Sequence, residues 1–353
     1  MGAAREEGVR LMAMSIEVAK SDYWKGRRTL VTGATGIVGS WLCEELVRLG
    51  AYVVAFVRDD DPASRFYSDG IDRHCAIVRG DLCEYAQIAR AINEHETDVI
   101  FHLGAQTIVG AALRDPLETF ESNIRGTYNL LEAARRLEGV VRAIVVASSD
   151  KAYGESDVLP YVETMPLRGR HPYDVSKSCT DLLSDTYAHT YGLNVTVARC
   201  GNIYGSGDLN WSRIVPGTIR SILAGQRPVL RSDGTMIRDY IYVRDVVDAY
   251  LELARQSERP EVTGEAFNFS PGSEYSVVQI VAAIGDAMGV EPVPLVVNTA
   301  KAEILRQTLD FSKARNLLGW MPRWTLPEAL VETVAWYEKH LSRTHMEAEH
   351  ARR

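Results

Sequence analysis

The 353-residue sequence lacks any long uninterrupted hydrophobic run, and its cysteines are few and scattered. Because no stretch of about 18 uncharged apolar residues occurs, we expect no transmembrane helix. The first residues mix arginine with glutamate and carry no apolar core of the kind found in signal peptides. The five cysteines are odd in number and show no CxxC spacing, which argues against a disulfide framework and against a zinc site. We therefore expect a cytoplasmic protein with reduced cysteines and no metal ion.

The sequence also lacks an excess of positive charge. Its formal net charge of -8 argues against nucleic acid as the main partner. An anionic small molecule would have to find a local cluster of arginines. The hydrophobic content of 46% at this length is enough for one large α/β domain with a smaller lobe.

Short apolar runs alternate with helix-like stretches through the first two hundred residues. Near-continuous apolar strands separated by helices are typical of a parallel sheet that is covered on both faces. We therefore expect a Rossmann-type doubly wound α/β fold with a smaller C-terminal substrate-binding lobe. The expected divisions are an N-terminal arm at 1–27, a dinucleotide-binding domain at 28–200, a lobe at 201–343 that mainly binds substrate and partly returns to the sheet, and a tail at 344–353.

A glycine-rich turn, Gly33-Ala-Thr-Gly36-Ile-Val-Gly39, lies between the first predicted strand and the following helix. The first glycine permits the tight turn, the second lets the backbone approach a pyrophosphate, and the third lets the helix pack on the strand. The helix N-terminus then faces the negative charge of the pyrophosphate. The expected dinucleotide contacts in this turn are Gly33, Thr35, Gly36, Ile37, Val38 and Gly39.

The identity of the dinucleotide is left open by the end of the second strand. Arg58 could pair with the 2′-phosphate of NADP, whereas Asp59 could accept hydrogen bonds from the ribose of NAD. Both could also be ordinary surface charges. Asp81 and Leu82, which follow the third strand, are placed for the adenine edge, although Asp81 fits a simple turn equally well. NAD and NADP remain alternatives.

Tyr173 and Lys177 are one helical turn apart at the start of a predicted helix and therefore lie on one face. A nearby ammonium, together with a positive nicotinamide ring, would lower the phenol pKa from its ordinary value of about 10. The tyrosinate could then take a hydroxyl proton as hydride leaves the carbon. At the end of the fifth strand, Ser148-Ser149 offers a hydroxyl to the reacting oxygen. Alone, the pattern also fits a packed tyrosine and an exposed lysine, but beside the glycine turn it indicates a nicotinamide-dependent enzyme.

These motifs together resemble the extended short-chain dehydrogenase/reductases, in particular the NAD-dependent epimerase/dehydratase family. The resemblance spans about Tyr23 to Tyr337 and implies that Ser149, Tyr173 and Lys177 act on a tightly held NAD(P). It adds Leu103, Ala105, Gln106 and Asn123 as cofactor contacts, and Gln106 with Thr107 as residues that touch the sugar or close the cofactor pocket. The motifs that carry it are TGATGIVGS, His102-Leu-Gly-Ala-Gln106, Asn123-Ile-Arg-Gly-Thr127, YDVSK and Arg238-Asp-Tyr-Ile-Tyr-Val-Arg-Asp245.

Within that family, Ser149-Asp150-Lys151 is most similar to the Thr-Asp-Lys of CDP-glucose 4,6-dehydratases. The resemblance implies that Lys151 removes the C5 proton and that Asp150 protonates the departing C6 hydroxyl. Ser149 in place of threonine, and Arg58, depart from that subgroup. A C4 epimerase, or a related redox-neutral isomerase or mutase, therefore remains an alternative. In that case Asp150 and Lys151 would form an ion pair that takes no part in catalysis. A non-catalytic dinucleotide sensor is the third hypothesis, against which the intact Ser149, Tyr173 and Lys177 argue.

A nucleotide-diphosphate hexose as substrate would require arginines in the second lobe, because the planar guanidinium binds phosphate oxygens in pairs. The candidates are Arg213, Arg238 and Arg306, although each could also be a surface arginine. Arg238 and Asn202 match the family's phosphate-binding arginine and substrate-contacting asparagine. The resemblance also implies a homodimer formed by the helices near 116–137 and 173–191. The nucleotide base stays open among CDP, GDP, UDP and dTDP.

Overall fold

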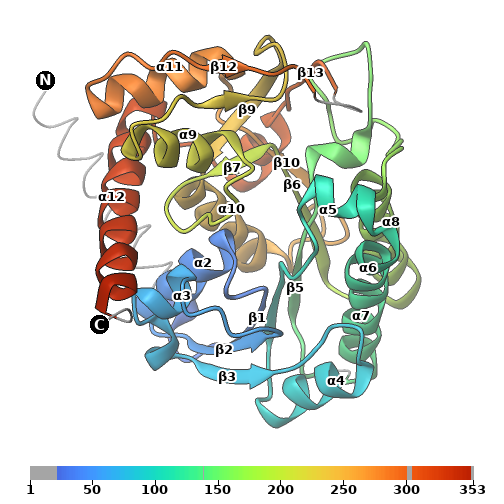
Figure 1. The fold of residues 1–353 in the computed structure, drawn as a ribbon. Helices are drawn as coiled ribbons and strands as arrows, with labels where there is room; N and C mark the ends of the chain where they lie inside the picture. Colours follow the sequence, from blue (N-terminus) through green and yellow to red (C-terminus); the bar gives the residue numbers. More distant parts are fainter. Residues whose placement is uncertain (1–21, 138, 300–303, 351–353) are drawn as a thin grey trace, which may run out of the picture.

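The computed structural model describes residues 22–137, 139–299 and 304–350, and a parallel seven-stranded sheet forms its centre (Figure 1). The predicted Rossmann-type fold is confirmed, with the strand order β10-β6-β5-β4-β1-β2-β3 and every neighbouring pair parallel. The strands are β1 (Arg28–Thr32), β2 (Tyr52–Val57), β3 (Ala76–Arg79), β4 (Val99–His102), β5 (Ala143–Ala147), β6 (Val195–Cys200) and β10 (Ala266–Phe269).

Helices cover both faces of this sheet (Figure 1). Successive strand residues point to opposite faces, so Val31 packs in the hydrophobic cluster with Leu42, whereas Leu30 packs in the other cluster with Leu130. Burial on both faces explains why the strands are continuous apolar runs. The helices are α2 (Ile37–Arg48) and α10 (Val243–Gln256) on one face, and α4 (Tyr85–Glu94), α7 (Gly126–Arg136) and α8 (Pro172–Tyr191) on the other.

Several short helical elements also lie between the main-sheet strands along the chain. The helix expected over 116–137 consists of three consecutive segments, because a π-helical stretch at Glu121–Arg125 joins its two halves. The short elements are α3 (Arg65–Ser68), α5 (Val109–Arg114), α6 (Pro116–Phe120) and the 3-10 turns at Ile71–His74 and Asp150–Tyr153.

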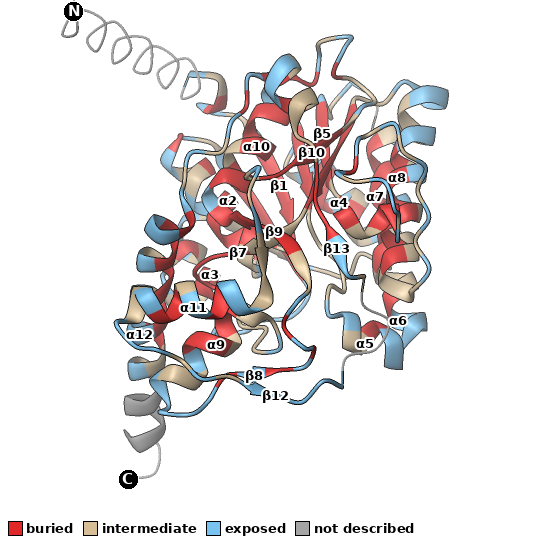
Figure 2. Ribbon diagram, turned by 90° about the horizontal axis from the view of Figure 1, so that it is seen from above, coloured by how far each residue is buried: buried red, intermediate tan, exposed pale blue. Residues whose placement is uncertain are grey.

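The chain beyond residue 200 forms the second lobe and also contributes α10 and β10 to the main domain. In the lobe, β9 pairs with β7, β11 and β13, and β8 pairs with β12. Figure 2 shows buried strands in the main sheet and exposed residues along β12. The lobe elements are β7 (Asn202–Tyr204), α9 (Ile214–Leu223), β8 (Val229–Leu230), β9 (Ile237–Tyr242), β11 (Glu274–Ser276), α11 (Val277–Met288), β12 (Leu295–Val296), β13 (Arg306–Gln307), a π-helical turn (Ala314–Leu318) and α12 (Leu326–His350).

The two ends of the chain differ from the expected arm and tail where they are described. Residues 1–21 and 351–353 lie outside the described residues, but Trp24 is buried with its ring 5.9 Å from that of Phe101. The helix α12 continues to His350, so the tail expected from residue 344 begins as helix. None of the helices in the described ranges has an apolar stretch long enough to cross a bilayer.

Candidate active site

A pocket of about 980 Å³ follows the carboxyl ends of the main-sheet strands and extends to the second lobe. This edge of an open α/β sheet is where such folds bind ligands. The pocket runs from the ends of β2 and β3, past the glycine turn, to the ends of β5 and β6, and it then reaches α9 and β9. It therefore offers one continuous path for a dinucleotide and a second ligand.

The glycine turn fits the diphosphate of a dinucleotide. Gly33 has a φ of +70°, and a Cβ there would lie 2.8 Å from the Gly104 nitrogen. At Gly39 a Cβ would lie 2.1 Å from the Gly33 carbonyl oxygen, so α2 could not pack this closely on the turn. Gly36 caps α2 and lines the pocket, which places the N-terminus of the helix toward a bound anion. The neighbouring residues Thr35, Ile37 and Val38 also line it.

At the end of the pocket next to β2 and β3, the lining includes Arg58, Asp81 and Leu82, which were predicted to contact the dinucleotide. The Arg58 Nε donates to Asp59 Oδ2 at 2.7 Å, so this guanidinium already has an anionic partner. Asp59 and Asp61 line the same end. Asp81 also accepts a hydrogen bond from the Cys83 amide at 2.8 Å, so it serves the turn and the pocket together.

The predicted Tyr173 and Lys177 lie on the first turns of α8, which begins at Pro172 because proline suits the first helical position. Both line the pocket together with Ser149. The Lys177 Nζ lies 6.0 Å from the centre of the Tyr173 ring and donates to the Ala147 carbonyl at 2.8 Å. The tyrosine, the lysine and the serine are thus brought together.

Burial controls the proton affinities of this group. It raises the pKa of Tyr173 to about 12, and the charge of Arg213 and a hydrogen bond with Ser149 oppose that rise. Burial lowers the pKa of Lys177 to about 8, against the opposing charge of Asp181. Desolvation of Tyr173 thus outweighs the charge of Arg213 and the hydrogen bond with Ser149. The predicted lowering of the phenol pKa includes the charge of a bound nicotinamide and stays a prediction.

The turn after β5 carries two further titratable groups into the pocket. Ser149 caps the 3-10 turn: its Oγ accepts from the Lys151 amide at 3.2 Å and donates to Asp150 Oδ1 at 2.9 Å. The Asp150 Oδ2 lies 3.8 Å from the Lys151 Nζ. Both side chains line the pocket beside Tyr173, and a carboxyl and an amine at this distance can serve as an acid and a base.

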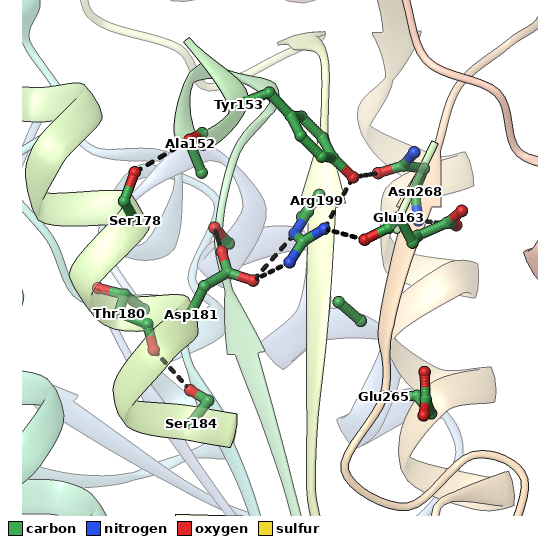
Figure 3. Close-up of polar contacts among 12 residues, drawn as sticks. Ala152, Tyr153, Glu163, Ser178, Thr180, Asp181, Ser184, Arg199, Glu265 and Asn268 are labelled. Carbon is green, nitrogen blue, oxygen red and sulfur yellow. Dashed lines mark hydrogen bonds and ion pairs between the residues drawn. The ribbon is translucent and has the colours of Figure 1, made fainter. Parts of the chain in front are cut away.

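A buried polar network fixes this turn from behind (Figure 3). Arg199 on β6 donates to Asp181 Oδ1 at 2.9 and 2.7 Å, and to the Tyr153 hydroxyl at 2.8 Å. The other Asp181 oxygen accepts from Ser148, just before the turn, while Tyr153 at its end donates to Asn268 at 2.7 Å. Sequence reasoning missed this network because its members come from four separate elements.

In the second lobe, the predicted Asn202, Arg213 and Arg238 line the pocket. Arg213 pairs with Asp208 at 3.1 Å and reaches the predicted Thr107 at 3.5 Å. Arg238 is buried and donates to the carbonyls of residues 237 and 305 at 2.8 and 3.3 Å. A further arginine, Arg231, also lines the pocket. The sequence analysis overlooked it, although its position seven residues before Arg238 was a usable signal.

Two residues that were predicted to contact a ligand, Asn123 and Arg306, do not line the pocket. The predicted Leu103, Ala105 and Gln106 do line it. Asn123 is buried and holds Gln106, since it accepts from the Gln106 amide at 2.7 Å and donates to its carbonyl at 3.0 Å. It therefore acts through Gln106. Arg306 is exposed on the far side of β13 and pairs with Glu274 at 2.6 Å, so the structure does not bring it to the site.

No group of three or more metal-binding side chains occurs among the described residues. All five cysteines are free thiols, and burial raises the pKa of Cys200, which lines the pocket, to about 12.

Comparison with known proteins places this pocket among nucleotide-sugar enzymes. The model of the family described as GDP-mannose 4,6 dehydratase matches residues 30–333. The CDP-glucose 4,6-dehydratase of Salmonella typhimurium is 30% identical over 90% of this chain and 92% of its own. The UDP-glucose 4-epimerase of Mycolicibacterium smegmatis is 32% identical over 88% of this chain and 98% of its own.

Experimental structures show the same fold with the two activities. The UDP-glucose 4-epimerase of Thermotoga maritima, with UDP-glucose, is 29% identical, has a TM-score of 0.81 and covers 89% of this chain and 99% of its own. The dTDP-glucose 4,6-dehydratase of Streptomyces venezuelae, with NAD bound, is 26% identical, has a TM-score of 0.79 and covers 88% of this chain and 97% of its own. The likeness thus extends to dehydratases and epimerases alike.

Proposed function

The chain belongs to the GDP-mannose 4,6-dehydratase family, and from that premise we propose that it is a nucleotide-sugar 4,6-dehydratase with a tightly bound NAD(P). The observation that carries the proposal is the turn at Asp150 and Lys151, which places a carboxyl and an amine in the pocket beside Ser149 and Tyr173. An epimerase that only oxidises and reduces C4 has no use for this second pair. A dehydratase needs it for the loss of water.

The residues around the glycine turn would hold the dinucleotide, which would supply hydride transfer from sugar C4 and back to C6. Tyr173 Oη takes the proton of the C4 hydroxyl. The Ser149 hydroxyl, which donates to Asp150 without substrate, turns to donate a hydrogen bond to the C4 oxygen. Lys177 is fixed on the Ala147 carbonyl, with its ammonium toward the Tyr173 ring. The phenolate is thereby stabilised once it forms.

Asp150 and Lys151 then carry out the elimination of water. The Lys151 amine takes the C5 proton, which the C4 ketone has made acidic, and the electrons of the C5–H bond form a C5=C6 double bond. The C6–O bond breaks, and the leaving hydroxyl takes a proton from Asp150 and departs as water. A neutral acid and a neutral amine thus become an ion pair, so that the total charge of the pocket stays constant during the step.

The substrate is a nucleotide-diphosphate hexose in this proposal. Arg213, Arg231 and Arg238 line the part of the pocket that lies beyond the sheet. Guanidinium groups recognise phosphate oxygens through paired hydrogen bonds. The net charge of -8 supports the companion prediction that nucleic acid is not a partner.

We infer NAD as the preferred dinucleotide. The Arg58 guanidinium is occupied by Asp59, and Asp59 with Asp61 lines the pocket at the end of β2. A 2′-phosphate would meet these carboxylates, whereas ribose hydroxyls can donate to them.

We also propose a homodimer in the cytoplasm. Exposed apolar side chains occur on α6, α7 and α8, including Leu117, Tyr128 and Leu182. They lie on the helices that the family resemblance assigns to an interface. The five free cysteines support a reducing compartment.

The second candidate is a C4 epimerase, favoured by the 32% identity to the mycobacterial enzyme. Three variants distinguish the candidates: Tyr173→Phe, Lys151→Ala and, as a control, Lys25→Ala at an exposed lysine. For a dehydratase, water loss should stop in the first two and persist in the control. For an epimerase, Lys151→Ala should keep most of its turnover, and that outcome would refute the proposed base.

A further inference from the structure

The side chain of Gln307 meets Lys151 behind the pocket wall. Its Oε1 accepts a hydrogen bond from the Lys151 Nζ, although the two residues are 156 positions apart in the sequence. Gln307 is fully buried, whereas the Lys151 side chain is 20% exposed. The glutamine therefore holds the amine from the protein side and leaves the other side of Lys151 toward the pocket.

The other end of the amide lies beside a buried tyrosine. Burial raises the pKa of Tyr161 to about 12, and a hydrogen bond with the Gln307 side chain opposes that rise. The Tyr161 hydroxyl also donates to the Gly154 carbonyl at 2.6 Å. The Gln307 amide thus lies between Tyr161 and Lys151, with its Oε1 on the lysine.

The backbone around Gln307 is held on both sides. In the parallel pairing of β13 with β9, Gln307 lies opposite Arg238, the buried arginine of the pocket. The Tyr161 amide donates to the Thr308 carbonyl at 2.8 Å, and the Leu309 amide donates to Asp239 Oδ2 at 2.8 Å. These contacts hold the backbone at residue 307 in place. The side-chain Oε1 that accepts from Lys151 therefore starts from a fixed position.

We propose that Gln307 is the positioning residue of the C5 base, and this rests on the dehydratase function proposed above. A neutral Lys151 amine has two N–H bonds and one lone pair. In this proposal the hydrogen bond to Gln307 orients the amine so that its lone pair faces the pocket, which the Lys151 side chain lines. After the C5 proton is taken, the same carbonyl accepts from the new ammonium.

An amide suits this task better than a carboxylate. A glutamate at the same place would favour the ammonium form and keep the base protonated to higher pH. Glutamine holds the nitrogen through a hydrogen bond and adds no charge. The base is oriented in this way while its neutral form stays accessible.

The test compares Gln307→Met with Thr308→Val. Methionine keeps the size of the side chain but removes the acceptor, and Thr308 is a buried neighbour whose hydroxyl lacks a partner among the described residues. In single-turnover mixing with the sugar nucleotide that wild type dehydrates, Gln307→Met should reduce its dinucleotide at the wild-type rate, followed at 340 nm. Water loss should slow about 10- to 100-fold, the usual effect of a misplaced group, so reduced dinucleotide accumulates. Thr308→Val should match wild type in both phases.

A second variant, Gln307→Glu, keeps the acceptor and adds a charge. The pH at which water loss is half-maximal should rise relative to wild type, and the rate above that pH should recover. If the pH dependence of water loss in Gln307→Glu were the same as in wild type, the proposal would be overturned, even if Gln307→Met failed to fold. Equal slowing of both phases in Gln307→Met, or no slowing, would overturn it as well. A wild-type enzyme that releases no water would instead refute the dehydratase function itself.

Discussion

Removal of the buried arginine behind the catalytic turn is expected to destabilise the protein strongly. Arg199 and Asp181 have side-chain exposures of only 7% and 3%, and the guanidinium meets one carboxylate oxygen at 2.7 and 2.9 Å. In Arg199→Met, the Asp181 carboxylate would stay buried, with the Ser148 hydroxyl as its remaining hydrogen-bond donor. Loss of one partner of a buried pair costs about 3–5 kcal/mol.

The assay is equilibrium unfolding in urea at fixed pH and dinucleotide concentration. Arg90→Met is the matched control, because the Arg90–Glu94 pair is exposed and 3.9 Å apart, and exposed pairs contribute about 0–1 kcal/mol. In the double variant Arg199→Met/Asp181→Leu, the loss should be smaller than the sum of the two single losses, since neither member of the Arg199–Asp181 pair is left without the other. A loss in Arg199→Met as small as that in Arg90→Met would refute this reasoning.

Three further outcomes follow from the structure. Leu182→Glu, on the exposed face of α8, should lower the mass measured by light scattering from dimer to monomer, whereas Val331→Glu on α12 should not; an unchanged mass for both would contradict the proposed interface. Burial raises the pKa of Asp239 from 3.8 to about 7. The protonated side chain therefore contributes fully to the unfolding free energy below pH 3.8, and this contribution is lost as the pH rises through 7. Asp239→Asn should therefore flatten the pH dependence of the unfolding free energy across that interval, and an unchanged slope would count against the shift. NADP should bind about 10-fold or more weakly than NAD because its 2′-phosphate meets Asp59; calorimetry on the dinucleotide-free protein should show a smaller difference in Asp59→Asn, and equal affinities in wild type would contradict the inference.

The parts of the site that are local in sequence could be predicted. The glycine turn needs three glycines within seven residues, and Tyr173 with Lys177 needs one helical turn, so short spacing determines both geometries. The main-sheet strands β1 to β6 were visible because burial on both faces makes them continuously apolar, whereas β10 was not identified from the sequence. Ser149, Asp150 and Lys151 follow the last residue of such a strand, which placed them at the binding edge.

The missed parts depend on contacts between distant segments. Gln307 lies in a two-residue strand whose partner, β9, is about seventy residues earlier, and nothing near it in sequence signals Lys151. Its neighbour Arg306 is exposed whereas Gln307 is buried, because successive strand residues alternate between faces, and neither residue lines the pocket. Asn123 was expected at the cofactor but holds the Gln106 backbone instead.

The central claim is tested most directly by the mass of the product. The purified protein would be incubated with CDP-, GDP-, UDP- and dTDP-hexoses in turn, and each product would be analysed by mass spectrometry. The account predicts that one of these substrates loses the mass of one water, which would also identify the nucleotide. Conversion to an isomer of unchanged mass would contradict the dehydratase, and it would make Asp150 and Lys151 a feature of the pocket wall in an epimerase.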